Sequence, residues 1–340
     1  EDHTRHWTGQ RHGMLGMVKI DGRTYRFMGK VNPFDERYSP EPAALLQTNL
    51  EITPLFTKYT FENDIITLRL SFLTPLLLNK PELASRPASY VYYSITVNDG
   101  RSHEITVYFD ISSEMSVNLP SQQIKFGKTD YSVYCGNTEQ SPLNKSGDNI
   151  RIDWGYLHLA HKNARALELI SRYNFIKNSE LKDADFNKPY TAMADYPVIA
   201  VISSSLSDVI CIAYDDIKSI EYFGSSIDAY YKTYYKTFDN MVKCALEDFK
   251  EVKAESEKFC IQLKADTDKV NKYYSDITAL TYRQTIAAHK TAADSEGNML
   301  FLSKECFSNG CIATLDVTYP SIPLYIKYNP EYVKGMLIPI

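Results

Sequence analysis

The period of the hydrophobic pattern changes once along this chain, and that change constrains the fold more than any other feature. Between residues 25 and 223, apolar and polar side chains alternate in short runs separated by turn residues, as in half-buried strands. Between residues 228 and 290, glycine and proline are almost absent and apolar residues recur at helical spacing. We therefore predict a β region followed by helices that begin between Asp228 and Asp268.

The β region contains two predicted hairpins. Residues 53–72 alternate on either side of an Asn63-Asp64 turn, and residues 90–97 and 104–111 flank the turn Asn98-Asp99-Gly100. Four further strands are predicted at residues 131–135, 150–154, 197–204 and 209–215. Many short strands with frequent turns are typical of an antiparallel β-sandwich.

The helical region has two predicted apolar faces, with the N-capping group Asp266-Thr267-Asp268 inside the span. The last helix is predicted to end within residues 287–299, and a turn at residues 295–298 leads out of it. The first face comprises Phe238, Met241, Val242, Ala245 and Phe249, and the second comprises Ile277, Leu280, Thr281 and Ile286.

Composition excludes several classes of protein. A chain of 340 residues that is 44% hydrophobic can build a large core, and its length favours two domains. The net charge of -5 argues against a nucleic-acid partner. The apolar runs are too short to span a bilayer. Residues 1–10 are polar and charged, unlike a signal peptide. The chain has no P-loop, no GxSxG and no dinucleotide fingerprint.

Neither metal nor cofactor is predicted. His3 and His6, like His158 and His161, are three residues apart, a spacing that binds metal on a helix, but neither pair lies in a predicted helix. Oxygen ligands for calcium stay an alternative. Cysteine occurs six times without a CxxC pair, so most cysteines are expected to be free and buried, while Cys306 and Cys311 are close enough to bridge.

Three segments together resemble the glutaminase A family of fungal secreted enzymes and their Bacteroidetes-type relatives. They are residues 4–29 (TRHWTGQRHGMLG…), residues 70–118 and residues 280–340, which open on LTYRQTIAAHK. The resemblance implies an N-terminal β-sandwich followed by a six-hairpin (α/α) toroid of the glycosidase type. It places a sandwich domain with a linker helix at residues 1–265 and the start of the toroid at residues 266–340.

Glu305 and Asp316 are the predicted catalytic residues. Amide hydrolysis needs a base for water and an acid for the leaving amine, and paired carboxylates supply both. Asn309 and the backbone at Gly310 could donate to a developing oxyanion. In the alternative interpretation, Asn309-Gly310 is a plain turn, Glu305 is a surface residue, and Asp316 caps a helix or pairs with an arginine.

The predicted substrate-binding residues come from three places in the chain. Arg5 suits a carboxylate and Trp7 suits stacking, although the Arg5-His6-Trp7 cluster could instead clasp the two domains together. Arg283 and Gln284 lie on the first predicted toroid helix, where pairing of Arg283 with a carboxylate is the alternative. Tyr319, before Pro320, could line a pocket or pack in the core.

The resemblance implies hydrolysis of L-glutamine to glutamate and ammonia, in a secreted or periplasmic protein. A glycoside hydrolase on the same scaffold is the first alternative, with a glycan as its substrate, and a non-catalytic binding or scaffold portion is the second. A complete toroid needs about twelve helices. We therefore expect that Ile340 is not the natural end and that the rest of the toroid, in the same or a second polypeptide, covers residues 325–340.

Overall fold

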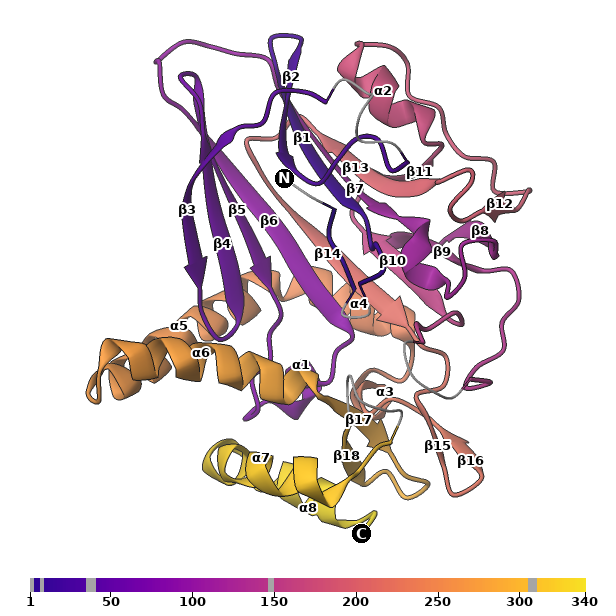
Figure 1. The fold of residues 1–340 in the computed structure, drawn as a ribbon, viewed down its shortest axis with the longest axis vertical. Coiled ribbons are helices and arrows are strands. Elements are labelled where there is room, and N and C mark those ends of the chain that lie inside the picture. Colours follow the sequence, from indigo (N-terminus) through magenta and orange to yellow (C-terminus); the bar gives the residue numbers. More distant parts are fainter. Residues whose placement is uncertain (1–2, 7–8, 35–40, 146–149, 305–310) are drawn as a thin grey trace.

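Two antiparallel sheets pack face to face in the computed structural model, which describes residues 3–6, 9–34, 41–145, 150–304 and 311–340 (Figure 1). The smaller sheet has the strand order β11-β13-β7-β1-β2. Its strands are β1 (Met14–Ile20), β2 (Arg23–Met28), β7 (Ile105–Ser112), β11 (Ala164–Leu167) and β13 (Val198–Ser203).

The larger sheet has the order β12-β8-β9-β10-β14-β6-β5-β4-β3. Leu68, Val107 and Ile210 belong to the buried cluster between the two sheets. The predicted antiparallel sandwich is therefore confirmed. The strands of the larger sheet are β3 (Leu46–Ile52), β4 (Phe56–Glu62), β5 (Ile66–Leu73), β6 (Ala88–Val97), β8 (Gln123–Lys128), β9 (Ser132–Asn137), β10 (Tyr156–Ala160), β12 (Tyr190–Thr191) and β14 (Ser207–Asp215).

The first predicted hairpin is present as β4 and β5, but the second is wrong. Strand β6 pairs with β5 and β14, whereas β7 pairs with β1 and β13 in the other sheet. The connection crosses between the sheets, and His103 fastens it. Its Nδ1 lies 2.6 Å from Asp21 and its Nε2 3.0 Å from Asp99. Alternation shows which face of a strand is buried, but it does not identify the neighbouring strand.

Two other strand predictions need correction. The β region begins at β1, before residue 25. Residues 150–154 form no strand, because their charged side chains are buried and bonded to neighbouring loops. Arg151 donates to the carbonyl of Asn118 (2.6 Å), and Asp153 accepts from Gln122 (2.7 Å).

Helices cover the outer face of the larger sheet and one end of the sandwich (Figure 1). Met241, Val242 and Val252 pack in one buried cluster with Tyr90 and Cys211 of the sheet. The longer elements are α4 (Phe238–Glu247), α5 (Phe249–Asp268), α6 (Lys272–Ala287) and α7 (Leu315–Tyr328). The shorter ones are α1 (Pro81–Ala84), η1 (Ser113–Ser116), α2 (Ile170–Ile176), α3 (Tyr231–Tyr235) and α8 (Glu331–Leu337), with the hairpin β15 (Ile220–Tyr222) and β16 (Ser225–Ile227). The continuous run of helices begins where predicted, at α3, but α1 and α2 are short helices within the predicted β region.

The first predicted helical face is largely correct and the second is wrong. Four of the five residues of the first face lie in α4 and are buried. In the second face, on α6, Ile277 is 62% exposed and Leu280 is 41% exposed, while Tyr282 and Ile286 of that helix are buried. Leu315, Tyr319 and Ile326 leave a similar exposed apolar face on α7. The expectation that further helices cover these faces stays a prediction.

The residues around α6 also differ from the prediction. Asp266, Thr267 and Asp268 end α5 rather than starting a helix, and the side chain of Asn271 caps α6 instead. After α6 the chain forms an unpredicted hairpin, β17 (His289–Ala293) and β18 (Met299–Ser303). His289 therefore lies on a strand.

None of the helices in the described part of the chain is both long enough and apolar enough to cross a bilayer.

Candidate active site

The end of β18 and the start of α7 lie beside the carboxyl end of α6. The backbone N–H of Lys304, just after β18, donates to the carbonyl of Ala288, just after α6 (2.8 Å). The N–H of Ala313 donates to the carbonyl of Ser303 (2.7 Å). These bonds place the start of α7 beside the end of β18.

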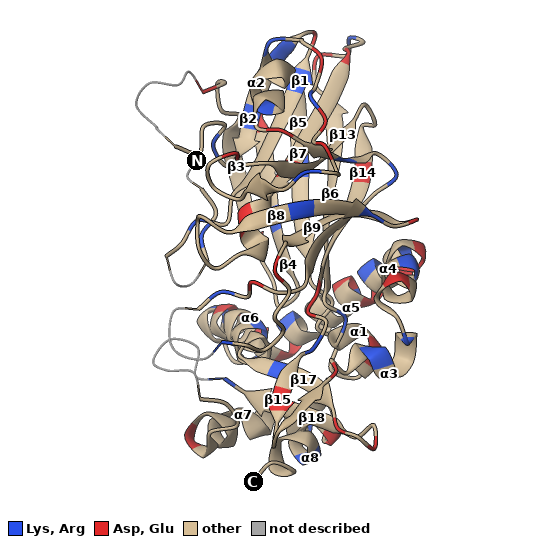
Figure 2. Ribbon diagram, turned by 90° about the vertical axis from the view of Figure 1, so that its right-hand side faces the viewer, with Lys and Arg blue, Asp and Glu red and all other residues tan. Residues whose placement is uncertain are grey.

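The N-terminal turn is defined here as residues 3–6 and 9–12. The N–H of His12 donates to the carbonyl of Thr4 (2.9 Å), so the segment folds back on itself. Burial lowers the pKa of His6, and the charges of Arg151 and Lys304 lower it further. The turn therefore lies within electrostatic reach of Lys304. Figure 2 shows the N-terminal end, α6 and α7 on the same side of the molecule, opposite α3 and α4.

An ion pair holds the N-terminal turn on the smaller sheet. Glu114, in η1, accepts from the side chain of Arg11 (3.0 Å), from the N–H of Gly13 (2.9 Å) and from the hydroxyl of Tyr196 (3.0 Å). Any residue larger than glycine at position 13 would bring its Cβ within 2.2 Å of that hydroxyl. The hydrogen bonds of the Glu114 carboxylate therefore hold the N-terminal turn in place, and we assign Glu114 no catalytic role.

The inner side of the turn is basic but carries a neutral histidine. Burial, with smaller effects from the charges of His6 and Arg151, lowers the pKa of His12 to about 3. The rings of His6 and His12 are 4.9 Å apart. Sequence reasoning missed His12, Arg151 and Lys304. For Arg151 a signal existed, because a strand with charged residues at alternate buried positions would be costly.

The structure brings some of the predicted site residues to this region. Arg5 is exposed on the N-terminal turn and donates to the carbonyl of Gly9 (3.2 Å). Arg283 and Gln284 lie on α6, four or five residues before Ala288. Asp316 and Tyr319 are exposed on the first turns of α7. Trp7, Glu305 and Asn309 lie outside the described residues.

Helix α7 turns Asp316 outward. Thr318 is buried and its hydroxyl lies 2.9 Å from that of Ser303, which fixes the inner side of the helix. Asp316 lies in the first turn, where the positive end of the helix dipole stabilises a carboxylate. Within the described part of the chain it forms no hydrogen bond or ion pair, so the alternative that it pairs with an arginine is not seen there.

Arg283 is half-buried between α6 and β4. Its Nη1 donates to the hydroxyl of Thr57 (3.0 Å). Burial lowers the pKa of Arg283 from its usual value. Gln284, the next residue, is exposed. The predicted alternative of a carboxylate partner for Arg283 is not seen among the described residues.

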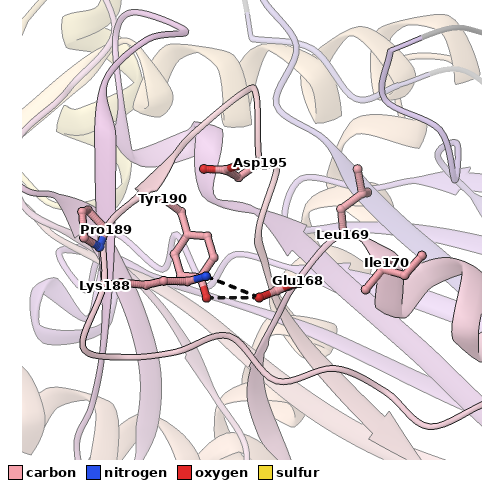
Figure 3. Close-up of a pocket in the computed structure, with 7 residues that line it drawn as sticks. All are labelled: Glu168, Leu169, Ile170, Lys188, Pro189, Tyr190 and Asp195. Atoms are coloured by element: carbon pink, nitrogen blue, oxygen red, sulfur yellow. Dashed lines mark hydrogen bonds and ion pairs between the residues drawn. The ribbon is translucent and has the colours of Figure 1, made fainter.

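A separate pocket of about 260 Å³ lies at the other end of the sandwich, between α2 and β12 (Figures 1 and 3). One of its two carboxylates, that of Glu168, is bound by Lys182 (2.6 Å) and by the hydroxyl of Tyr190 (3.5 Å). The pocket includes none of the predicted site residues. Its lining comprises Glu168, Leu169, Ile170, Lys188, Pro189, Tyr190 and Asp195.

The described residues contain no group of three or more His, Cys, Asp or Glu that could hold a metal ion. His158 is buried in β10, where Ser132 bonds its Nδ1 (2.8 Å), and His161 pairs with Asp208 (3.1 Å). The buried thiols of Cys135, Cys211 and Cys260 are free, as expected.

Comparison with known proteins gives matches along the whole chain. Residues 56–266 match the domain of unknown function DUF5127, residues 1–33 match DUF4964, and residues 271–340 match the glutaminase A six helical-hairpin domain. Among solved structures, a bacterial glucoamylase complexed with acarbose has a TM-score of 0.45 at 9% identity, over 81% of this chain and 34% of its own.

Two named relatives match over 98% of this chain. Glutaminase A of Aspergillus oryzae is 28% identical, and a probable glutaminase of Arthroderma benhamiae is 22% identical. The matches cover 50% and 43% of those proteins, so the chain spans about half the length of its named relatives. With the sandwich, the helical-hairpin match and the relatives in agreement, the chain belongs to the glutaminase A family.

Proposed function

We propose that the protein is a glutaminase-type amidohydrolase that converts L-glutamine to glutamate and ammonia. The observation that carries the proposal is the similarity to glutaminase A of Aspergillus oryzae over nearly the whole chain. Two basic residues support it, Arg283 on α6 and Lys304 beside the carboxyl end of that helix, since glutamine presents a carboxylate as well as the amide to be cleaved.

The proposed chemistry uses the carboxylates of Glu305 and Asp316. One carboxylate takes a proton from water as the oxygen attacks the amide carbon. The other, protonated at the start, gives its proton to the nitrogen as the C–N bond breaks, which leaves glutamate and ammonia. The exposure of Asp316 on the first turn of α7, without a partner among the described residues, leaves it open to a substrate.

Ammonia release by the protein expressed from its complete coding sequence tests the proposal. Glu305→Gln and Asp316→Asn should each lower kcat by about 100-fold or more, because a positioned acid or base contributes that much. Glu331→Gln removes an exposed carboxylate from neighbouring α8 and serves as the matched control, with unchanged kcat expected.

An assay of the same samples on a panel of glycans distinguishes the amidohydrolase from the glycoside hydrolase. Cleavage of a glycan without ammonia release from glutamine would establish the glycoside hydrolase instead. Activity on glutamine that survives in both carboxylate variants would leave the amidohydrolase but remove Glu305 and Asp316 from its chemistry.

A further inference from the structure

Arg283 differs from the other inward-facing arginines of the described chain in the groups that accept hydrogen bonds from its guanidinium. Four of them contact a carboxylate: Arg11 with Glu114, Arg26 with Glu41, Arg86 with Asp248, and Arg172 with Asp110. A fifth, Arg151, donates to backbone carbonyls. Arg283 donates only to the hydroxyl of Thr57 among the described residues.

A half-buried guanidinium in this condition keeps donors that no described protein group accepts. It carries five N–H donors in a planar fork, and one hydroxyl acceptor leaves most of them without a protein partner. Partial burial removes hydration that would otherwise compensate the charge, and no carboxylate among the described residues replaces it. The arrangement stores binding energy for an anion that arrives from outside.

The surroundings of Arg283 leave room for such an anion. Its bond to Thr57 holds the side chain against β4, and the half-buried ring of Tyr59 is close enough to influence its charge. On α6, Leu280 and Gln284 are exposed on either side of Arg283. The site is thus fixed on one side by the sheet and open on the other.

We propose that Arg283 binds the carboxylate of a small acid or amino acid on the face where α6 packs against β4. The guanidinium fork matches a carboxylate with two parallel hydrogen bonds, and Thr57 keeps the fork from rotating. The exposed amide of Gln284 offers both a donor and an acceptor to the same ligand. In its application to glutamine, the inference rests on the proposed function, and it assigns Arg283 to the α-carboxylate.

Calorimetry with glutarate tests the site without any catalytic turnover. The wild-type protein, expressed from its complete coding sequence, should bind glutarate but not the uncharged glutaramide. Arg283→Gln should weaken glutarate binding by about 10- to 100-fold, the usual effect of losing hydrogen bonds to a charged group. Arg283→Lys keeps the charge without the fork and should lie between the two. Arg165→Gln removes an arginine of β11, at the edge of the smaller sheet, that pairs with Asp183 and is far in sequence from Arg283; it serves as the matched control and should bind as the wild type does.

Kinetics with two amides test the assignment to the substrate. For glutamine, Arg283→Gln should raise KM by about 10- to 100-fold with little change in kcat, as expected when binding is lost equally in the ground and transition states. For 4-aminobutanamide, which lacks the α-carboxylate, the wild type and the variant should have the same kcat/KM. Thr57→Val should produce a smaller rise in KM for glutamine.

The two sets of measurements fail independently. Absence of ammonia release by the wild type, with glutarate binding that depends on Arg283, would refute the glutaminase function and keep the carboxylate site. Equal glutarate affinity in the wild type and in folded Arg283→Gln or Arg283→Lys, or no glutarate binding at all, would refute the site whatever the enzyme hydrolyses. Loss of stability without loss of affinity would show that Arg283 is only structural.

Discussion

The buried histidine His158 makes the stability of this protein depend on pH. His158 lies in β10 with 4% of its surface exposed, and its ring packs 4.4 Å from Phe238 of α4 and 4.9 Å from Tyr134 of β9. Burial lowers the pKa of His158 to about 3, from 6.5 in its ordinary state. Protonation therefore disrupts the contact through which α4 packs on the larger sheet.

The sign and size of the effect follow from the difference between the two pKa values. Between pH 6.5 and pH 3 the unfolded chain binds a proton at this residue and the folded chain does not, so stability falls as pH falls. From about pH 7 to about pH 5, the loss from His158 alone amounts to about 2 kcal/mol. His12, whose pKa is also lowered to about 3, adds a similar loss in the same window.

Urea unfolding of His158→Asn at both pH values isolates the contribution of His158. Between about pH 7 and about pH 5, the wild type should lose about 2 kcal/mol more than the variant, since His12 titrates in both proteins and cancels. Ser132→Ala removes the hydrogen bond to Nδ1 but keeps the buried imidazole, so it should retain the steep pH dependence. Equal losses in the wild type and in His158→Asn would refute the assignment of the effect to this residue.

Two further predictions concern ion pairs that hold the sandwich together. Arg172→Met should destabilise the protein by about 3–5 kcal/mol in urea unfolding, because it leaves the fully buried Asp110 without its bidentate partner; the double variant with Asp110→Leu should recover much of that loss, and additive losses would contradict the coupling. His103, which bonds two aspartates at the crossing between the sheets, has a raised pKa caused first by its bond to Asp21 and then by that to Asp99. Its contribution to stability should be complete below pH 6.5 and lost as pH rises through the higher folded value, and a His103→Gln variant that loses stability to the same extent at every pH would contradict this.

The pattern in the sequence predicted the layers of this fold better than their connections. Period-two alternation located the sandwich, and the helical spacing of Phe238, Met241, Val242 and Ala245 located the face of α4 that packs on it. Strand β6 pairs with β5 and β14 rather than with β7, because β6 and β7 belong to different sheets. No local pattern distinguishes a tight hairpin from a crossing of the sandwich, because both bury alternate residues.

Periodicity also gave the wrong face for α6. The sequence offers Ile277, Leu280 and Ile286 at helical spacing, yet only Ile286 is buried. Tyr282 takes the inward position because its hydroxyl reaches the carbonyl of Leu76 (2.7 Å) while its ring packs on Phe259. A tyrosine with a hydrogen-bond partner can thus replace an aliphatic residue in a core, and its position is decided by a distant loop.

The candidate site was predictable in its residue types but not in its assembly. Arg283 and Gln284 were visible as polar residues on a helix, whereas the N-terminal turn comes within electrostatic reach of Lys304 only in the folded chain. That approach depends on the fold of the N-terminal turn and on hairpin β17–β18, which the sequence did not reveal. Chemistry carried on separate elements becomes a site only through such tertiary contacts.

The basic residues near the end of α6 suit substrate binding rather than catalysis. The chain as a whole carries a net charge of -5, yet Lys304 is bonded through its backbone to Ala288 just after α6, Arg283 lies one turn earlier on that helix, and Arg151 lies against the N-terminal turn. Positive side chains of this kind cannot activate water for attack on an amide, because they have no basic lone pair while protonated. They can hold a carboxylate and orient the rest of the ligand. If the proposed carboxylates perform the hydrolysis, these basic groups therefore serve recognition, and the two roles can be separated by mutation: the basic side chains should govern KM, and the acidic ones kcat.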